Sequence, residues 1–350
     1  MSSEAGFETI VGHAHAKAVL TAALANDRVA HAYLFHGAAH IGKFLTAATF
    51  AKMGLCPHPK AGSASGLSTL ASCGQCRSCL AVDSGSHPDF REVRPDGSQI
   101  KIGQIRELQD AIAFKPLIGS RKWFLVDEAD AMNPEAANGF LKTLEEPPDH
   151  SVLILISARP QTLLPTILSR CQAVRFGPAP LPELTQWLQR RRGLGPKEAN
   201  VLAALAMGRI GIAAEADPAV LKSERDRVLD ALSKERLEDP AELFNQPDEL
   251  AATPEQLARS LDTIEVWLRD VLIARHDPDP TLLINQDVPE RITTWSRAVS
   301  TDSVLETMTL IHHLRRAAPR NLNHALVLET VLLKLRDAVI GESAADSKPN

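Results

Sequence analysis

Residues 36–44 (HGAAHIGKF) have the spacing of a loop that binds nucleotide phosphates. Four residues separate Gly37 from Gly42 and Lys43, between a strand-like run and a helical pattern. In such loops the backbone N–H groups and the start of the helix hold the phosphates, and the lysine reaches the terminal ones. The next position usually carries Ser or Thr, which binds Mg²⁺, but here it is Phe44. Without that oxygen we expect a weak or unused nucleotide site and no ATP hydrolysis by this chain alone.

A second acidic motif lies downstream of this loop. The apolar run at 123–126 ends in Asp127 and Glu128. In an active ATPase the first acid would hold the metal and the second would polarise the attacking water. Such a run is common by itself, but after a GxxxxGK loop it is typical of a nucleotide site. Because Phe44 lacks a metal-binding oxygen, the alternative is that both acids only cap the strand and the following helix.

The cysteines indicate a metal site. Four of the five lie close together in the sequence: Cys56, Cys73, Cys76 and Cys79. A Cys-x-x-Cys-x-x-Cys run with one more cysteine upstream is typical of a closed, structural zinc site, because four thiolates leave no open position for catalysis. His58 and His87 are alternative ligands. An iron–sulfur cluster has similar spacing, and free thiols are the remaining alternative.

The composition is that of a globular protein with more than one domain. The chain has 350 residues, of which 44% are hydrophobic and 23% charged. Its formal net charge of −5 argues against a protein that binds nucleic acid by itself, so we expect any DNA contact to be shared with partners. The N-terminus has no secretory signal pattern, and the longest apolar stretch, 152–156, is too short to span a membrane. We therefore expect a cytoplasmic protein.

The hydrophobic pattern predicts an α/β core followed by helices. Helical periods alternate with strand-like runs at 33–36, 89–93, 123–126, 152–157 and 173–176. This alternation favours a parallel sheet with helices on both faces. Strand patterns stop at the Gly-Pro-Ala-Pro run 177–180, and Ser-rich residues 59–72 favour a flexible loop. The predicted parts are a core at 1–178 with a cysteine insert at about 56–79, a small helical part at 179–240, a second helical part at 241–340 and a disordered tail at 341–350.

These motifs together resemble the AAA+ clamp-loader subunits of bacterial DNA polymerase III. The resemblance is dense from about residue 7 to 176, and LEEPP with SRC is its most specific pair of segments. The matching segments are 11–13 (VGH), 28–35 (RVAHAYLF), 37–43, the cysteine insert, 100–106 (IKIGQIR), 126–130 (VDEAD), 141–148 (LKTLEEPP) and 163–171 (LLPTILSRC).

The resemblance implies a fold and a set of partners. It implies a RecA-like core with a parallel five-stranded sheet, an all-α lid and an all-α collar that oligomerises. The partners would be other clamp-loader subunits, with the sliding clamp and primed DNA contacted through the complex. ATP and Mg²⁺ would lie at the interface with a partner subunit, and the chain would be part of the DNA polymerase holoenzyme. A structural Zn²⁺ would complete the cofactors.

The resemblance also gives Arg170 a role. In this family the arginine of SRC enters the ATP site of the neighbouring subunit, where a planar, permanently charged fork meets phosphate oxygens. The alternative is that Arg170 only pairs with an acid on its own surface. Active relatives carry a polar sensor near Ser157 and a lid arginine where this chain has Ile212, which also indicates a subunit without turnover. The competing functions are an ATP-hydrolysing motor subunit of the loader, an autonomous P-loop ATPase and a zinc-dependent nucleic-acid-binding module.

Overall fold

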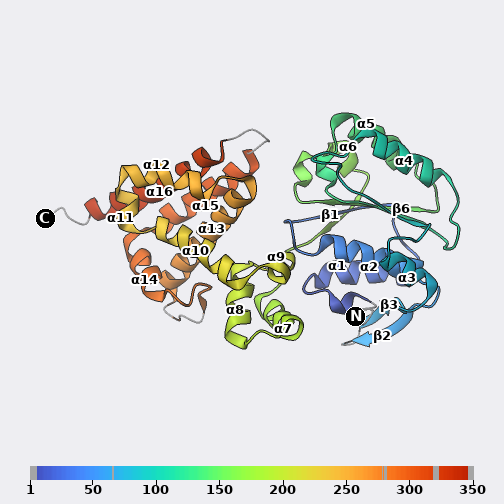
Figure 1. The fold of residues 1–350 in the computed structure, drawn as a ribbon, viewed down its shortest axis with the longest axis horizontal. Helices are drawn as coiled ribbons and strands as arrows, with labels where there is room; N and C mark the ends of the chain where they lie inside the picture. Colours follow the sequence, from blue (N-terminus) through green and yellow to red (C-terminus); the bar gives the residue numbers. More distant parts are fainter. Residues whose placement is uncertain (1–5, 65–66, 278, 280–281, 318–322, 346–350) are drawn as a thin grey trace. The chain divides into compact units, whose positions relative to one another are not determined.

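The computed structural model describes residues 6–64, 67–277, 279, 282–317 and 323–345 (Figure 1). The chain divides into two compact units, one formed by residues 1–199 with 206–215 and the other by 200–205 with 216–350. The predicted boundary after residue 178 lies inside the first unit, and the one after 240 lies inside the second. The division into three domains therefore stays a prediction. Within the described residues, no helix is both long and apolar enough to cross a membrane.

The first unit is built on a five-stranded sheet in the order β4-β5-β6-β1-β7. All neighbouring strands in this sheet pair in parallel, as the sequence predicts. Every predicted strand is found in it. The strands are β1 (Ala32–His36), β4 (Phe90–Val93), β5 (Lys122–Val126), β6 (Ser151–Ser157) and β7 (Gln172–Arg175).

Helices cover both faces of this sheet, and each face has its own apolar core (Figure 1). Alternate residues of a strand point to opposite faces. Tyr33 and Phe35 accordingly pack with α1 (Ala14–Ala25) and α2 (Lys43–Leu55). Leu34 lies in the other core, which receives side chains from the helices of that face. These helices are α4 (Ile102–Ala113), α5 (Pro134–Glu145) and α6 (Pro165–Leu168). The short helical turns of the unit are η1 (Phe7–Thr9), η2 (Ala129–Ala131) and η3 (Pro160–Thr162).

The cysteine insert contains an antiparallel hairpin. Strands β2 (Lys60–Ala64) and β3 (Leu67–Ala71) pair from Lys60 with Ala71 to Ala64 with Leu67, and helix α3 (Arg77–Asp83) follows. The prediction of a flexible loop at 59–72 was therefore wrong for the described residues of this segment. Serine and glycine composition favours a loop, but small residues also fit a two-stranded ladder once its backbone groups pair with each other. Residues 65 and 66 lie outside the described part.

Helices make up the rest of the chain. They are α7 (Leu181–Arg192), α8 (Pro196–Leu205), α9 (Ile210–Glu215), α10 (Pro218–Ala231), α11 (Lys234–Glu238), α12 (Pro240–Leu250), α13 (Pro254–His276), α14 (Pro289–Ala298), α15 (Thr301–Ala317) and α16 (His324–Ala345). Helix α13 begins with a capping box between Thr253 and Gln256, and its buried Trp267 lies in the core of the second unit.

The prediction of a disordered tail from residue 341 was wrong for its first part. Helix α16 continues to Ala345, because Glu and Ala at 342–345 favour extension of a helix that has already formed. Residues 346–350 lie outside the described part of the chain.

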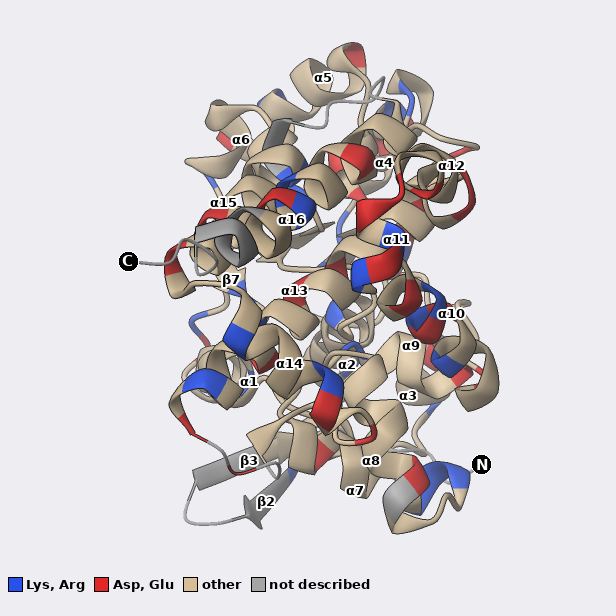
Figure 2. Ribbon diagram, turned by 90° about the vertical axis from the view of Figure 1, so that its left-hand side faces the viewer, with Lys and Arg blue, Asp and Glu red and all other residues tan. Residues whose placement is uncertain are grey.

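The helices of the second unit carry mixed charge. Figure 2 shows acidic and basic residues together on α10 and α11. Arg236 pairs with Asp230 and Glu242, and Lys234 pairs with Glu238. On these two helices the cations are therefore partly neutralised by nearby acids.

Candidate functional site

The predicted nucleotide-site residues and Arg170 lie at opposite ends of the strands of the sheet. Gly37 follows β1 and Asp127 follows β5, so the nucleotide motifs lie where these parallel strands end. Arg170 comes before β7, whose first residue Gln172 pairs with Tyr33 near the start of β1. Arg170 therefore lies at the edge where the strands begin. Strands rise about 3.3 Å per residue, so these edges are roughly 15 Å apart.

The lysine of the GxxxxGK loop, residues 37–43, bonds to the backbone of that same loop. Lys43 Nζ donates hydrogen bonds to the carbonyl oxygens of Gly37 at 2.8 Å and of Ala38 at 2.6 Å. The lysine is only 6% exposed, and this burial lowers its pKa to about 8, although Asp127 and Asp130 oppose the shift. A side chain at Gly37 would place Cβ 2.3 Å from the carbonyl oxygen of Phe176, so this position requires glycine.

The side chain at the usual magnesium position packs under an arginine. The guanidinium carbon of Arg94 lies 4.6 Å from the centre of the Phe44 ring. This distance is within the range of a cation–π contact. The place of the expected hydroxyl is thus taken by an aromatic ring with a fixed positive charge above it.

The small helical segment that begins at α9 contacts the loop directly. Gly211 donates its N–H to the carbonyl oxygen of His40 at 2.8 Å. A Cβ at Gly42 would lie 3.5 Å from Ile210, and His13 Nε2 lies 2.7 Å from the carbonyl oxygen of Ile41. Backbone oxygens on one side of the loop are therefore engaged by protein groups.

The two acids after β5 have separate local roles. Asp127 Oδ1 accepts the N–H of Glu128 at 3.0 Å, which is the capping contact expected if these acids serve the backbone. Glu128 is exposed and has a left-handed backbone (φ 48°). The charge of Asp127 favours the protonated form of Lys43.

Asp130 is a residue of this edge whose role the sequence did not reveal. It is buried and accepts the Ser157 hydroxyl at 2.8 Å, the Ala158 N–H at 3.3 Å and Arg159 Nε at 2.8 Å. Burial would raise the pKa of Asp130, but the hydrogen bonds from Ser157 and Arg159 hold it below the usual value. The polar residue at the sensor position is therefore bonded to a fixed carboxylate. The only sequence signal was a third acid in the VDEAD segment.

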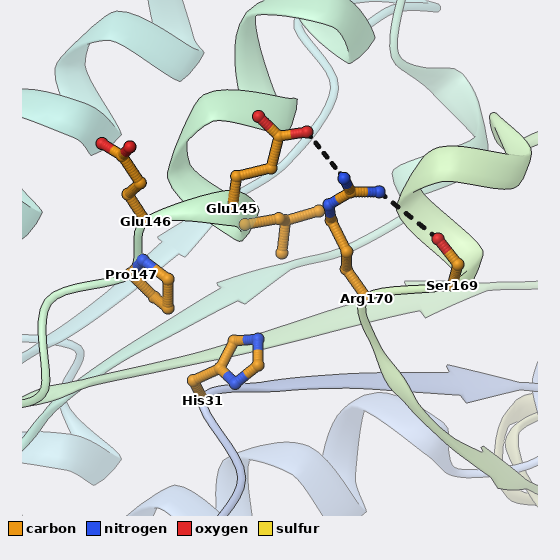
Figure 3. Close-up of a pocket in the computed structure, with 7 residues that line it drawn as sticks. His31, Glu145, Glu146, Pro147, Ser169 and Arg170 are labelled. Carbon is orange, nitrogen blue, oxygen red and sulfur yellow. Dashed lines mark hydrogen bonds and ion pairs between the residues drawn. The ribbon is translucent and has the colours of Figure 1, made fainter.

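Arg170 lines an open pocket of about 550 Å³ (Figure 3). Its Nη2 is 2.8 Å from Glu145 Oε1, and its Nη1 donates to the Thr166 carbonyl oxygen at 3.0 Å and to Ser169 Oγ at 3.4 Å. The Arg170 side chain is 35% exposed. The acid partner considered in the sequence analysis therefore exists, and it is Glu145. The pocket is lined by His31, Leu144, Glu145, Glu146, Pro147, Ser169 and Arg170.

The four clustered cysteines come together in space. Their sulfur atoms all lie within 4.8 Å of one another, and those of Cys73 and Cys79 are 3.9 Å apart. Zn–S bonds of about 2.3 Å in a tetrahedron require sulfurs roughly 3.8 Å apart. Backbone N–H groups of Cys73 and Cys76 point at the sulfurs of Cys56 and Cys73, each at 3.3 Å. The N–H groups of Gln75 and Cys76 lower the pKa of the Cys73 thiol to about 6, which favours a thiolate. The donor set fits a structural metal.

The alternative histidine ligands are not part of this cluster. Among the described residues, the group of metal-ligating atoms that lie within range of one another consists of the four cysteines. His87 is buried, with Nε2 3.3 Å from Ser78 Oγ and Nδ1 accepting the Asp89 N–H at 3.0 Å. His58 contributes its backbone N–H, which bonds Cys56.

The sheet order, the GxxxxGK loop after its β1 strand and the acids after β5 define the AAA+ class of protein. The family model for the DNA polymerase III delta subunit matches residues 12–180, and the model for the C-terminal part of the delta subunit matches residues 220–337. The chain is therefore similar to DNA polymerase III delta subunits along both of these segments. The first matched segment lies in the first compact unit and the second matched segment lies in the second.

Two curated delta′ subunits are similar to this chain over part of its length. The DNA polymerase III subunit delta′ of Pseudomonas aeruginosa is 37% identical over 211 residues, 59% of this chain and 61% of the relative. The delta′ subunit of Bacillus subtilis is 41% identical over 152 residues, 43% of this chain and 44% of the relative. The chain thus spans about half the length of these curated relatives. A solved gamma subunit-related protein from Thermotoga maritima has a TM-score of 0.44 and 20% identity, covering 91% of this chain and 99% of that one.

Proposed function

We propose that this chain is a delta′-like subunit of the DNA polymerase III clamp loader that inserts Arg170 into the ATP site of a neighbouring subunit. Together with its partners it helps to load the sliding clamp onto primed DNA. One observation carries the proposal. Arg170 lies at the end of the sheet where its strands begin, while Lys43 and Asp127 lie near the end where the strands finish. An arginine placed there is too far from its own loop to contact a nucleotide bound in that loop. Any nucleotide phosphate that Arg170 contacts therefore belongs to the site of another chain.

The chain's own loop supports the absence of turnover. Phe44 offers no oxygen to Mg²⁺, Lys43 bonds the loop carbonyls, and the lid position 212 is isoleucine. Phosphoryl transfer depends on a metal and cations that neutralise charge as it develops. We therefore assign ATP and Mg²⁺ to the interface with a partner subunit.

The partners follow from the names of the relatives. The chain is similar to delta′ subunits and also to tau and gamma subunits, such as the tau/gamma subunit of Haemophilus influenzae, which is 38% identical over 165 residues. A hetero-oligomer built from related subunits fits this pattern. The cysteine cluster serves as a structural Zn²⁺ site, because four sulfur donors leave no open coordination position. The protein works in the cytoplasm, where DNA is replicated.

Similarity to tau subunits also favours a second candidate, the ATP-hydrolysing motor subunit. A motor subunit would turn over ATP with Mg²⁺ as an isolated chain. The residues at 44 and 212 argue against it, and an ATPase assay on the purified chain separates the two candidates.

The experiment for the favoured function is steady-state ATPase of the reconstituted loader with Arg170→Ala. We expect lower turnover with unchanged assembly, because the positive charge leaves the neighbour's site while the sheet remains intact. Arg175→Ala is the matched control, since Arg175 is the last residue of β7, the strand that follows Arg170, and is exposed. Equal rates for both variants and the parent would remove the finger role.

A further inference from the structure

The arginine assigned to a neighbour's site is held by its own chain. Arg170 contacts Glu145 of α5 through Nη2 at 2.8 Å, and its Nη1 contacts Ser169 at 3.4 Å (Figure 3). The same Nη1 donates to the carbonyl oxygen of Thr166 at 3.0 Å. These contacts come from the last residue of α5, from helix α6 and from the residue before the arginine. The guanidinium is therefore bound by groups of its own chain.

The geometry of a guanidinium makes this contact competitive with phosphate binding. Its N–H donors lie in one plane and point in fixed directions. The Nη1–Nη2 edge is one of the two edges that can grip two oxygens of a phosphate side by side. In Arg170 both of these nitrogens already bond groups of the same chain. A phosphate that binds this edge competes with the Glu145 carboxylate for Nη2.

We propose that Glu145 stows Arg170 in the absence of a neighbour's nucleotide and so regulates when the finger acts. The inference rests on the proposed function, because it assumes that Arg170 serves a phosphate in trans. A triphosphate carries more negative charge than one carboxylate and takes the guanidinium when it arrives. Until then, the pair keeps the finger folded against the LEEPP segment.

The strength of the contact suits a reversible latch. The side chains of Arg170 and Glu145 are 35% and 49% exposed. Ion pairs exposed to this extent are weak and are screened by salt. Removal of the carboxylate charge should therefore raise the population of free finger by at most about fivefold.

Glu146 provides a matched control within the same pocket. It is the next residue in the LEEPP segment and has the same charge as Glu145. Figure 3 shows its carboxylate apart from the guanidinium, whereas that of Glu145 is joined to it. A general effect of pocket charge would therefore appear in Glu146→Gln, and an effect of the latch would appear only in Glu145→Gln.

The test measures ATP turnover by the reconstituted loader with Glu145→Gln, Glu146→Gln and Arg170→Ala, at an ATP concentration well below saturation and at two salt concentrations. We expect Glu145→Gln to turn over about two- to fivefold faster than the parent at low salt. This gain should shrink at high salt, where the pair is screened in the parent, and Glu146→Gln should match the parent. Slower turnover by Glu145→Gln, or equal behaviour of the two glutamate variants, overturns the latch. If Arg170→Ala keeps the parent's rate, the proposed function itself fails, which is a distinguishable result.

Discussion

Lys43 Nζ donates a hydrogen bond to the carbonyl oxygen of Gly37 at 2.8 Å. The lysine that would meet a phosphate in an active loop instead closes the loop on itself. Because Lys43 is buried, this contact links the nucleotide motif to the stability of the first unit.

Lys43 should give the folded chain a measurable pH dependence. Its pKa is about 8 in the folded state and 10.5 ordinarily, so between these values the unfolded chain binds the extra proton. The free energy of unfolding should then rise with pH through this window, by at most about 1.4 kcal/mol per pH unit. Denaturant unfolding of the parent and of Lys43→Met between pH 8 and 10.5 measures this slope. The free energy of unfolding should rise with pH in the parent but not in Lys43→Met. If the two proteins show the same pH dependence, the lowered pKa of Lys43 is contradicted.

Phe44→Thr should not restore ATP hydrolysis to the isolated chain. The substitution returns a hydroxyl to the loop, but Ile212 still replaces the lid arginine and Lys43 still bonds Gly37 and Ala38. Mg²⁺-dependent phosphate release is the measurement. Strong turnover by this single variant would show that the hydroxyl alone was missing and that the lid matters little.

Purified chain should contain about one equivalent of zinc, and Cys76→Ser should lose it. A serine hydroxyl is a poor substitute for a thiolate, so the insert should also lose thermal stability. Metal analysis with thermal unfolding checks both effects. Cys171→Ser is the control. Cys171 lies outside the four-cysteine cluster, so this variant protein should keep its zinc. A parent protein without zinc would remove this assignment.

Asp130→Ala should destabilise the first unit by about 2 kcal/mol or more. The substitution leaves the buried Ser157 hydroxyl and the charged Arg159 side chain without their carboxylate. Urea unfolding gives the change in the free energy of unfolding. Glu128→Ala serves as a control with an effect within about 0.5 kcal/mol, since Glu128 is exposed. A change for Asp130→Ala as small as for the control would show that the network contributes little.

The sequence predicted the sheet and the cysteine cluster because both have short-range signals. The buried runs at 123–126 and 152–157 are long, apolar and bounded by polar residues, so their identity as strands is recognisable. Cysteine spacing likewise limits the possible partners of each thiol. The hairpin strands at 60–64 and 67–71 were missed because most of their residues are small, and the pairing of their backbones has no signature in the hydrophobicity of the sequence.

The contacts of the site residues depend on distant parts of the chain and could not be predicted. Arg94 lies 50 positions beyond Phe44 in the sequence, yet it covers that ring. Glu145 and Arg170 meet because α5 ends at the edge where β7 begins, and no local pattern encodes that meeting. Chemistry-bearing residues were thus recognisable by type, whereas their partners required the fold.

The most direct test of the account is single-turnover ATP hydrolysis by the fully assembled loader. Arg170→Ala should remove the fast hydrolysis of one site while ATP binding and the composition of the complex stay as in the parent, because the guanidinium acts on charge that develops during phosphoryl transfer. An unchanged amplitude and rate of the fast phase would contradict the account, since no ATP site in the assembly would then depend on this arginine.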